Sequence, residues 1–388
     1  MADYIPFAIQ EEIMKRLPTK SLMRFRSVSK SYKYLIDSSK FIVDYSFNHT
    51  HQKHLLVSYF DTKTFEPKYV SFVDDDDTFP REKCFLPVPV PVPRSPSLFY
   101  QPTIIGSSQG LFCLNINIKN SRKNAKKVVL WNPSIRKSVA LVVPDNLDQV
   151  HDVITIGFGV CPYSRDPKLV KINYCKKHYP KSKFFTPWRV EVYTLSSGSW
   201  RSIPTVTQPR KSIFLRSEQV VTDEFIYWLA TDGISYRKRT WDFEGYNMVV
   251  SFELASEKFM EVSLPDTLAR AYNDKIAISK LKRSLVVVEV FKEANKEVFV
   301  VWMMKRNTFT KLLVINSPDA SIQGVRGFWN YIEPTPRMIS PDKPIFEKGT
   351  HISVQELNSE HIIYTGVIVN GLEYGAHSYT ETLLLLDY

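Results

Sequence analysis

Two short motifs carry residue types that catalytic and cofactor sites use. Gly106-Ser107-Ser108-Gln109-Gly110 fits the pattern G-x-S-x-G, in which a serine nucleophile lies on a strained turn between a strand and a helix. Here the composition of the following residues, Leu111 to Ile116, is typical of a strand, so the motif predicts a turn between two strands. Gly157-Phe158-Gly159 lacks the third glycine and the following helix of a dinucleotide site. Neither motif therefore indicates an enzyme.

Clusters of possible metal ligands are also incomplete. His49, His51 and His54 lie close together in the sequence, but no cysteine and no second histidine cluster completes a set of four ligands. The run of carboxylates from Asp74 to Asp77 is more typical of a solvated loop than of a calcium site. We therefore expect no catalytic residues, no metal and no cofactor in this chain.

The cysteines and the apolar pattern favour an intracellular compartment. The chain has four cysteines, at Cys84, Cys113, Cys161 and Cys175, and no C-x-x-C pair. Their spacing suits neither a disulfide framework nor a zinc site. The first residues lack the basic and apolar regions of a secretory signal. No apolar run approaches the roughly 18 residues that a membrane helix needs. We expect a protein of the cytoplasm, the nucleus or both, with no membrane partner.

Positive charge is concentrated in two segments of a chain whose net charge is +11. Five cations and no acid lie between Lys119 and Lys127, and residues 165–189 hold eight cations against one aspartate. Ordinary solvated loops are the favoured interpretation of both segments, but aromatic residues interleave with the second one and raise it as a recognition surface. An acidic protein is the favoured partner, and nucleic acid is the less favoured alternative. The residues that we expect to bind a target are Lys123, Lys126, Lys127, Lys176, Lys177, Lys181 and Trp188.

The pattern of apolar residues changes near residue 45, from a helical period to the period of a strand. Before it, a spacing of four predicts a helix whose apolar face is formed by Ile5, Ile9, Ile13 and Leu17. Pro18 interrupts this helix, and Ser21 is a suitable N-cap for the next one. The next helix carries a second apolar stripe at Leu22, Phe25, Val28, Tyr32 and Leu35. So short a segment has too little area for a core of its own, so its apolar residues need a partner, either the rest of the chain or another protein.

From residue 46 onward the apolar period changes to two, which is typical of strands. One series of polar turns has intervals of 48, 57, 58, 59 and 65 residues, at Asp61, Gln109, Asp166, Glu224, Arg283 and Lys348. A second series has intervals of 66, 59 and 50 residues, at Asn132, Gly198, Glu257 and Asn307. Two hairpins in about 57 residues make one four-stranded blade of a β-propeller.

The fold class that these patterns predict is α+β by segments. A small all-α unit over residues 1–45 precedes an all-β propeller of about six four-stranded blades over residues 46–388. We expect the last strand, Thr382 to Asp387, to complete the first blade and close the ring. Seven smaller blades or an irregular β-sandwich are the alternatives.

The first forty-five residues resemble an F-box. The family's pattern is matched outright by Arg16-Leu17-Pro18, Lys20-Ser21-Leu22, Arg24-Phe25, Leu35-Ile36 and Phe41. The departures are Ile5 and Met14 in place of leucine, Ser29 in place of cysteine and Tyr32 in place of tryptophan. All of these except Ser29 keep an apolar or aromatic side chain, so we expect binding to survive with some loss.

The resemblance implies that this helical unit docks onto a Skp-family adaptor, which bridges to a cullin–RING ubiquitin ligase. Binding of this kind places an apolar helix face in a groove of another chain. We expect the contact to be made by Ile5, Pro6, Ile9, Ile13, Leu17, Pro18, Leu22, Val28 and Tyr32. Some of these residues will belong to the internal core of the F-box instead.

A second resemblance, to the plant F-box-associated domain of type 1, covers most of the remaining chain. Its landmarks occur in family order in the segments 106–114, 130–137, 157–159, 190–195, 199–201, 251–259 and 301–305. The sequence departs from the family at Asp166-Pro167-Lys168, where the family has aspartate-tyrosine-lysine. This resemblance supports a kelch-like propeller.

Together these observations predict a non-catalytic, substrate-recognition adaptor of an SCF-type cullin–RING ubiquitin ligase. The F-box would bind the Skp-family adaptor, and the propeller loops would bind the target that is to be ubiquitinated. The alternatives are an F-box protein that binds a partner without promoting its degradation, and a propeller that binds RNA or phosphate.

Overall fold

The structure is a computed structural model of the 388-residue chain. The residues it describes are 5–48, 53–61, 64, 66–73, 83–87, 102–116, 127–144, 152–175, 187–236, 243–281, 283–293, 296–316, 337–340, 343–348, 351–355, 362–368 and 374–386. The chain divides into two compact units. Unit 1 is Met1–Ser58, Phe65–Pro144 and His377–Tyr388, and unit 2 is Tyr59–Thr64 and Asp145–Ala376.

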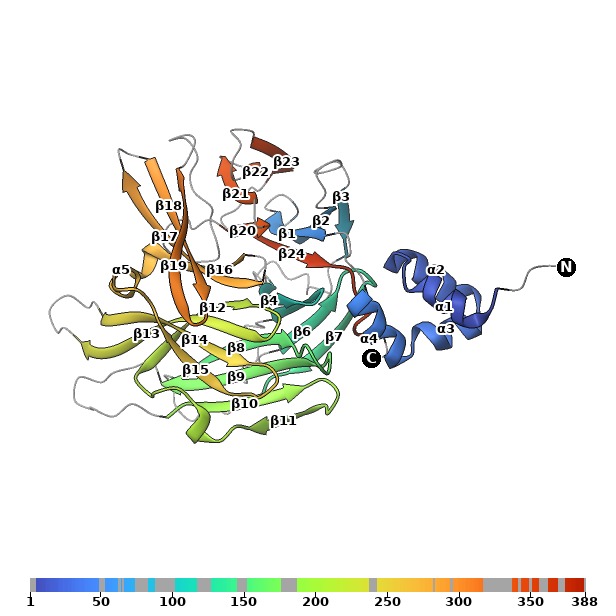
Figure 1. The fold of residues 1–388 in the computed structure, drawn as a ribbon, viewed down its shortest axis with the longest axis horizontal. Coiled ribbons are helices and arrows are strands. Elements are labelled where there is room, and N and C mark those ends of the chain that lie inside the picture. Colours follow the sequence, from blue (N-terminus) through green and yellow to red (C-terminus); the bar gives the residue numbers. More distant parts are fainter. Residues whose placement is uncertain are drawn as a thin grey trace. The chain divides into compact units, whose positions relative to one another are not determined.

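Unit 1 begins with four helices, drawn in blue in Figure 1. They are α1 (Phe7–Met14), α2 (Thr19–Val28), α3 (Lys30–Ile36) and α4 (Ser39–Asn48). Pro18 separates α1 from α2, as predicted, because a proline is not tolerated in a helix interior. The predicted N-cap at Ser21 is wrong, because Pro18 occupies the cap position and Ser21 lies inside α2.

The second predicted stripe does not form one helix. The backbone is extended at Ser29, with φ −140° and ψ 129°, and this residue ends α2. The Ser29 hydroxyl then accepts a hydrogen bond from the backbone N–H of Tyr32 and caps α3. A hydroxyl residue competes with the helical backbone in this way, and the apolar spacing of the sequence did not reveal the break.

A small core holds the four helices together. Leu22, Ile36 and Tyr45 are fully buried in it. The hydroxyl of Tyr45 donates to the carbonyl of Leu17 (3.1 Å) and also forms a hydrogen bond with the hydroxyl of Thr19 (3.1 Å). These contacts tie α4 to the start of α2. In the part of the chain that the structure describes, no helix is long and apolar enough to cross a membrane.

Two four-stranded sheets belong mainly to unit 1. The first sheet has the order β24 (Tyr374–Thr380), β1 (Lys53–Asp61), β2 (Glu66–Val73), β3 (Lys83–Leu86). The second follows chain order, with β4 (Thr103–Ser108), β5 (Leu111–Ile116), β6 (Lys127–Asn132) and β7 (Lys137–Val142).

Unit 2 contains three sheets of the same kind whose side chains are described. The first is β8 (Asp152–Val160), β9 (Pro167–Cys175), β10 (Arg189–Thr194) and β11 (Ser199–Ser202). The second is β12 (Ile213–Val221), β13 (Phe225–Tyr236), β14 (Phe243–Glu253) and β15 (Phe259–Ser263). The third is β16 (Ile276–Leu281), β17 (Ser284–Glu293), β18 (Lys296–Lys305) and β19 (Thr308–Asn316).

Four further strands of unit 2 also pair in chain order, and only their backbone is described. They are β20 (Arg337–Ser340), β21 (Lys343–Lys348), β22 (His351–Gln355) and β23 (Ile362–Ile368). The short helices of unit 2 are η1 (Thr205–Thr207), α5 (Asp266–Ala269) and η2 (Asn273–Lys275). The expected fold class, helices followed by an all-β domain, is therefore confirmed, whereas the predicted number of blades stays a prediction.

Most of the predicted turns lie at hairpins of these sheets. Turns between first and second strands contain or adjoin Gln109, Asp166, Glu224 and Arg283. Turns between third and fourth strands contain or adjoin Asn132, Gly198, Glu257 and Asn307. Asp61 instead ends the second strand of its sheet, because the first strand of that sheet, β24, comes from the C-terminal part of the chain.

The strand that completes the first sheet lies earlier in the chain than predicted. β24 pairs with β1 and ends at Thr380, whereas residues 381–386 form no strand. The apolar run Leu383–Leu386 is buried all the same. An apolar run alone does not distinguish a strand from another buried segment, which is why the prediction of Thr382 to Asp387 was wrong.

Glycines allow the first two sheets of unit 2 to pack closely. A Cβ atom on Gly157 of β8 would lie 2.4 Å from Cζ2 of Trp228 in β13. A Cβ atom on Gly159 would lie 2.9 Å from Cδ2 of Leu254. Between these glycines, the N–H and carbonyl of Phe158 both bind the side-chain amide of Gln219 in β12, at 2.8 and 2.9 Å. The Gly-Phe-Gly segment is therefore a packing element.

Candidate binding surfaces

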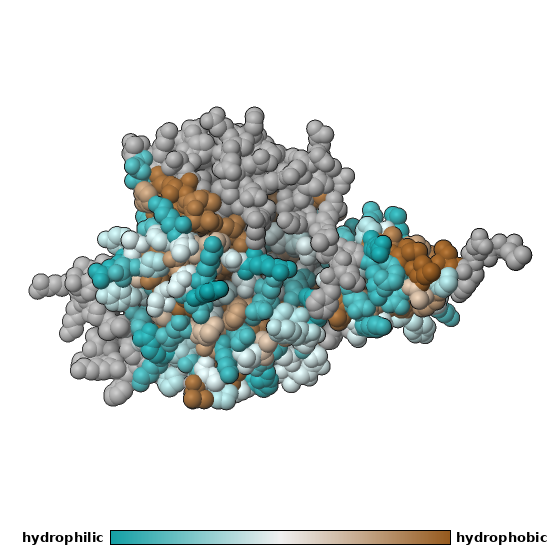
Figure 2. Space-filling view, in the orientation of Figure 1, coloured by the Kyte–Doolittle hydropathy of each residue, from teal (hydrophilic) through white to brown (hydrophobic). Residues whose placement is uncertain are grey.

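The helices of unit 1 expose large apolar side chains. Ile5, Ile9 and Ile13 are 49%, 52% and 47% exposed, although isoleucine is among the residues most often buried in proteins. Figure 2 shows hydrophobic residues, coloured brown, gathered over these helices. Four further exposed side chains on the same helices are Phe7, Phe25, Val28 and Tyr34. We call these seven residues the apolar helix surface, and exposure of this kind indicates a site that binds another protein.

The nine predicted contact residues divide between this surface and the interior. Exposed are Ile5, Pro6, Ile9, Ile13, Pro18 and Val28, while Leu17 and Tyr32 are half-buried. Leu22 is fully buried, so its assignment to the contact surface is wrong. It lies on the face of α2 that packs against the other helices.

Tyr32 of α3 links three helices beneath the apolar helix surface. Its hydroxyl donates to Oε1 of Gln10 in α1 (2.8 Å), and its ring meets Phe25 of α2 edge-on, with 5.8 Å between ring centroids. Tyr32 thus contacts both α1 and α2 from α3. An aromatic side chain at this position is expected to support the surface as well as to contribute to it.

Ion pairs also fix the helices. Nζ of Lys15 lies 2.9 Å from Glu11, 3.0 Å from Glu12 and 3.1 Å from Asp44. The hydrogen bond to Glu11 raises the pKa of Lys15 above its ordinary value, despite the opposing effect of burial. A second pair joins Arg26 to Asp37 through two nitrogens and both carboxylate oxygens, at 2.5 and 2.9 Å. The apolar helix surface is therefore preorganised before any partner binds.

Two members of the surface, Phe7 and Tyr34, were missed by the sequence analysis. Phe7 lies outside the four-residue stripe of α1, and Tyr34 belongs to α3, which the predicted stripe merged with α2. Phe7 follows Pro6 and precedes Ala8, and Tyr34 precedes Leu35, so their neighbours in the sequence gave no signal of exposure.

Most of the predicted target-binding lysines lie outside the described residues. They are Lys123, Lys126, Lys176, Lys177 and Lys181. Lys127 is described: it is exposed and is the first residue of β6. The segments 117–126 and 176–186 connect the second and third strands of their sheets, β5 to β6 and β9 to β10.

Trp188 does not belong to a recognition surface. It is 1% exposed and packs in the core between the first two sheets of unit 2. Its indole N–H donates to the carbonyl of Ile213 (3.2 Å), and its ring stacks on Tyr174 with 5.8 Å between centroids. Trp188, Val190 and Val192 alternate along the strand direction and all face this core. This alternation in the sequence indicated a buried Trp188 and argued against its predicted role in binding a target.

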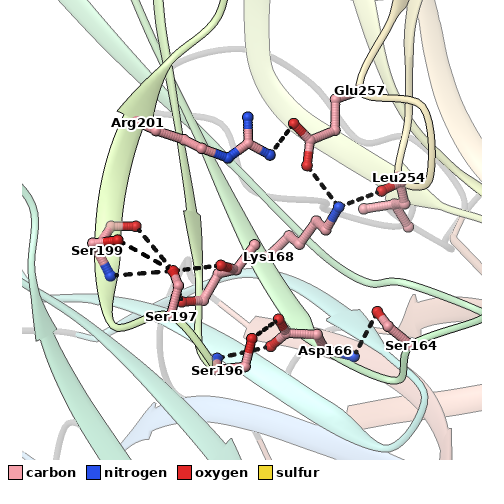
Figure 3. A network of polar contacts seen from close by, with 10 residues as sticks. Ser164, Asp166, Lys168, Ser196, Ser197, Ser199, Arg201, Leu254 and Glu257 are labelled. Atoms are coloured by element: carbon pink, nitrogen blue, oxygen red, sulfur yellow. Dashed lines mark hydrogen bonds and ion pairs between the residues drawn. The ribbon is translucent and has the colours of Figure 1, made fainter.

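A polar network joins the turns of neighbouring sheets in unit 2, and Figure 3 shows its side chains. Nζ of Lys168 donates to the carbonyl of Leu254 (2.8 Å) and to Oε1 of Glu257 (2.7 Å). Glu257 also binds Arg201. Lys168 and Arg201 belong to one sheet and Glu257 to the turn of the next, so the network links two sheets.

The charges in this network are matched. Burial alone would raise the pKa of Glu257, but the hydrogen bonds from Lys168 and Arg201 together hold it below its ordinary value. Within the same sheet, Asp166 accepts hydrogen bonds from the backbone N–H (3.1 Å) and the hydroxyl (2.5 Å) of Ser196. The Glu257 carboxylate between its two cations is therefore a structural contact. A general acid must carry a proton at neutral pH, and Glu257 is deprotonated.

The motifs that first suggested chemistry have structural roles. Ser107 and Ser108 end β4, and Gln109-Gly110 forms a tight turn into β5, with φ of 48° and 81°. The predicted turn between two strands is thus confirmed. Of the histidine cluster, His49 and His51 lie outside the described residues, while the ring of His54 stacks on Tyr379 (5.2 Å). Among the described residues, no group of three His, Cys, Asp or Glu side chains could hold a metal ion.

A short helical unit with an exposed apolar face, followed by successive four-stranded sheets, is the architecture of an F-box followed by a β-propeller. The comparison with protein families agrees: residues 4–44 match the F-box domain, and residues 102–325 match the F-box associated beta propeller domain. The second match covers more than half of the chain, and the chain belongs to this family.

Plant F-box proteins are similar to this chain along most of their length. The F-box protein CPR1 of Arabidopsis thaliana is 24% identical, over 93% of this chain and 81% of its own. The Arabidopsis F-box/kelch-repeat protein At3g23880 is 25% identical, over 80% of this chain and 79% of its own. Among solved structures, the β-propeller domain of the Trilobed protease from Pyrococcus furiosus matches 68% of this chain and 81% of its own, at 9% identity and a TM-score of only 0.35.

Proposed function

We propose that this chain is a substrate-recognition adaptor of an SCF-type cullin–RING ubiquitin ligase. The observation that carries the proposal is the apolar helix surface within a segment that matches the F-box domain. A groove on a Skp-family adaptor would remove Ile5, Ile9 and Ile13 from water. Full burial of an exposed side chain of this size contributes about 1.5–3 kcal/mol, and these three are half exposed, so each would contribute about half of that.

In this proposal the chain makes and breaks no bond itself. The ligase supplies the ubiquitin-conjugating enzyme in trans, and the adaptor contributes proximity between that enzyme and a lysine of the target. Ubiquitination of the target would take place where cullin–RING ligases act, in the cytoplasm, the nucleus or both.

We place the target site at one end of the sheets of unit 2. Within each antiparallel sheet, the connection from the second to the third strand leaves from the end opposite the two hairpin turns. The connections from one sheet to the next start from this same end, which we call the connection end. Most of the exposed large apolar side chains among the described residues of unit 2 lie near it, namely Val206, Tyr246, Tyr272, Phe291 and Val314, whereas Leu312 lies in the middle of β19. Tyr163 and Met260 lie near the opposite end.

The charge of the connecting segments favours an acidic target. Residues 176–186, between β9 and β10, contain four lysines and no acid, and residues 237–242, between β13 and β14, contain three cations and one aspartate. Arg270 contributes a described cation beside Tyr246, with its guanidinium carbon 5.8 Å from the ring centroid. Aromatic and cationic side chains together suit a protein segment with acidic and apolar residues.

The adaptor contact is tested by binding of the full chain to a purified Skp-family adaptor, measured by calorimetry. Ile9→Asp should weaken binding at least tenfold, because it places a charge in an apolar contact. The control is Val206→Asp, which changes an exposed apolar residue of unit 2 and should bind as the wild type does. Equal affinity of wild type and Ile9→Asp would contradict the proposal.

Nucleic-acid binding makes a different prediction, because phosphate contacts release counterions and their strength falls steeply with salt. Titration of the full chain with labelled single-stranded RNA at increasing salt separates the two readings. Tight RNA binding that falls with salt would favour the RNA-binding alternative, and weak binding at low salt would favour an acidic protein target.

A further inference from the structure

Helix α2 begins without a capping side chain of its own. Its N-cap residue is Pro18, which has no side-chain hydrogen-bond acceptor. The hydroxyl of Thr19, the first helical residue, is engaged with the hydroxyl of Tyr45 (3.1 Å). The first backbone N–H groups of a helix have no partner within the helix, so the donor on Thr19 needs an acceptor from elsewhere.

That acceptor comes from the C-terminal part of the chain. The backbone N–H of Thr19 donates to Oε2 of Glu381 (2.9 Å), across a sequence separation of 362 residues. The side chain of Glu381 is 22% exposed, so the contact is largely shielded from water. A carboxylate at this place also interacts favourably with the positive end of the helix dipole.

The segment that carries Glu381 is itself held firmly by the second sheet of unit 1. The side-chain amide nitrogen of Asn132 donates to the carbonyls of Thr382 (2.9 Å) and Leu384 (2.7 Å). Nζ of Lys137 donates to the carbonyl of Leu386 (3.0 Å). The four leucines Leu383–Leu386 are buried. The segment Glu381–Leu386, which we call the strap, therefore cannot shift without breaking several contacts.

Side chains of the first sheet surround Glu381 on its other side. Oε1 of Glu381 lies 3.9 Å from Nε2 of His54, whose ring stacks on Tyr379. The hydroxyl of Tyr379 in turn forms a hydrogen bond with the hydroxyl of Ser71 in β2 (2.8 Å). Glu381 is thus the point at which the helices, the first sheet and the strap meet.

We propose that Glu381 is a positioning residue that locks the helical unit to the first two sheets through the strap. This inference rests on the proposed function, because a locked helical unit matters when the distance from the ligase to the bound target must be kept. Glu381 adds nothing to the contact with the Skp-family adaptor. It fixes the orientation of the first two sheets relative to the helical unit that binds the adaptor.

The lock is tested in the full chain with Glu381→Ala and Glu381→Gln. Hydrogen exchange of the Thr19 amide should become about tenfold faster in Glu381→Ala, since a charge-assisted hydrogen bond is lost. Glu381→Gln keeps an acceptor and should show a smaller change. The matched control is Glu66→Gln, which changes an exposed carboxylate of β2 that pairs with Lys68 (3.0 Å) and leaves the helices untouched.

A second measurement separates positioning from plain stability. Spin labels at Lys33→Cys in α3 and Ala140→Cys in β7, in a background with Cys84→Ser and Cys175→Ser, report the distance between the helices and the second sheet. We expect Glu381→Ala to broaden the distance distribution, while the affinity for the Skp-family adaptor stays within twofold of the wild type. Ubiquitin transfer to the chain's own lysines in the reconstituted ligase should fall or change sites.

The outcomes distinguish this inference from the proposed function. An unchanged distance distribution and an unchanged Thr19 exchange rate in Glu381→Ala would overturn the lock. Broadening with unchanged adaptor affinity would support it. If the wild type does not bind the adaptor at all, the proposed function fails, yet the exchange and distance measurements still decide whether Glu381 locks the helices.

Discussion

Trp188 and Gly157 show how packing between two sheets decides the role of single residues. Trp188 follows a basic segment and is aromatic, which made it a candidate for recognition, yet its place in the strand alternation directs it into the core. Gly157 belongs to a Gly-Phe-Gly segment that contains only part of a dinucleotide-binding motif, and the ring of Trp228 occupies the space where a side chain would be. In both cases the neighbour that decides the role is distant in the sequence.

Trp188→Ala should lower the free energy of unfolding by about 3–5 kcal/mol, the usual cost of removing a large buried aromatic side chain. The variant also leaves the carbonyl of Ile213 without its donor. Urea unfolding of the full chain, followed by circular dichroism, measures the effect. Tyr163→Ala, at an exposed turn, is the control and should stay within about 0.5 kcal/mol of the wild type. Similar unfolding midpoints for the two variants would show that Trp188 is not a core residue.

Glu257 makes stability depend on pH. Its pKa is lower in the folded chain than the ordinary value of 4.5, so its contribution is present above that pH and is lost as the pH falls through the folded pKa. Between pH 6.5 and pH 3, the melting temperature of Glu257→Gln should therefore fall less than that of the wild type. Glu66→Gln, which changes an exposed carboxylate of β2, should keep the wild-type slope. If the melting temperatures of the wild type and Glu257→Gln depend equally on pH, the ion pairs of Glu257 do not stabilise the fold.

At the scale of elements, the sequence predicted the helices and hairpins better than their ends. A helix before Pro18 and the break at Pro18 are confirmed, because local propensity decides both, although only Ile9 and Ile13 of the predicted stripe lie within α1. Most turns were found because polar residues interrupt alternating strands at regular intervals. The break at Ser29 and the closing strand β24 were not found. A single side-chain cap decides the first, and pairing with a strand more than 300 residues away decides the second.

Asn132 tests how much the strap contributes to unit 1. Its side chain is fully buried, donates to two strap carbonyls and accepts from the N–H of Ser134 (2.9 Å). Asn132→Ala leaves these groups without partners, so the free energy of unfolding should fall by about 2 kcal/mol or more. The control is Asn307→Gly, at the corresponding turn between β18 and β19, where φ is 62° and glycine is tolerated. A loss no larger than that of the control, measured by urea unfolding, would mean that the strap is not held through Asn132.

For the whole molecule, the sequence predicted an F-box followed by a propeller, and the family comparison shows both. Specific short motifs made this possible, since they occur in the first forty-five residues and again, in family order, from residue 106 to residue 305. The target site could not be predicted in the same way. Its lysines come from connecting segments whose composition shows charge but not arrangement, and its one aromatic candidate, Trp188, proved to be buried.

The most direct test of the central claim is capture of a cullin by the tagged full chain in the presence and absence of a purified Skp-family adaptor. We predict that cullin is recovered only when the adaptor is present, because the adaptor bridges the two proteins. Leu17→Asp and Pro18→Asp should each abolish recovery while the β-sheet signal in circular dichroism is retained. No recovery by the folded wild type, or full recovery by both variants, would contradict the account.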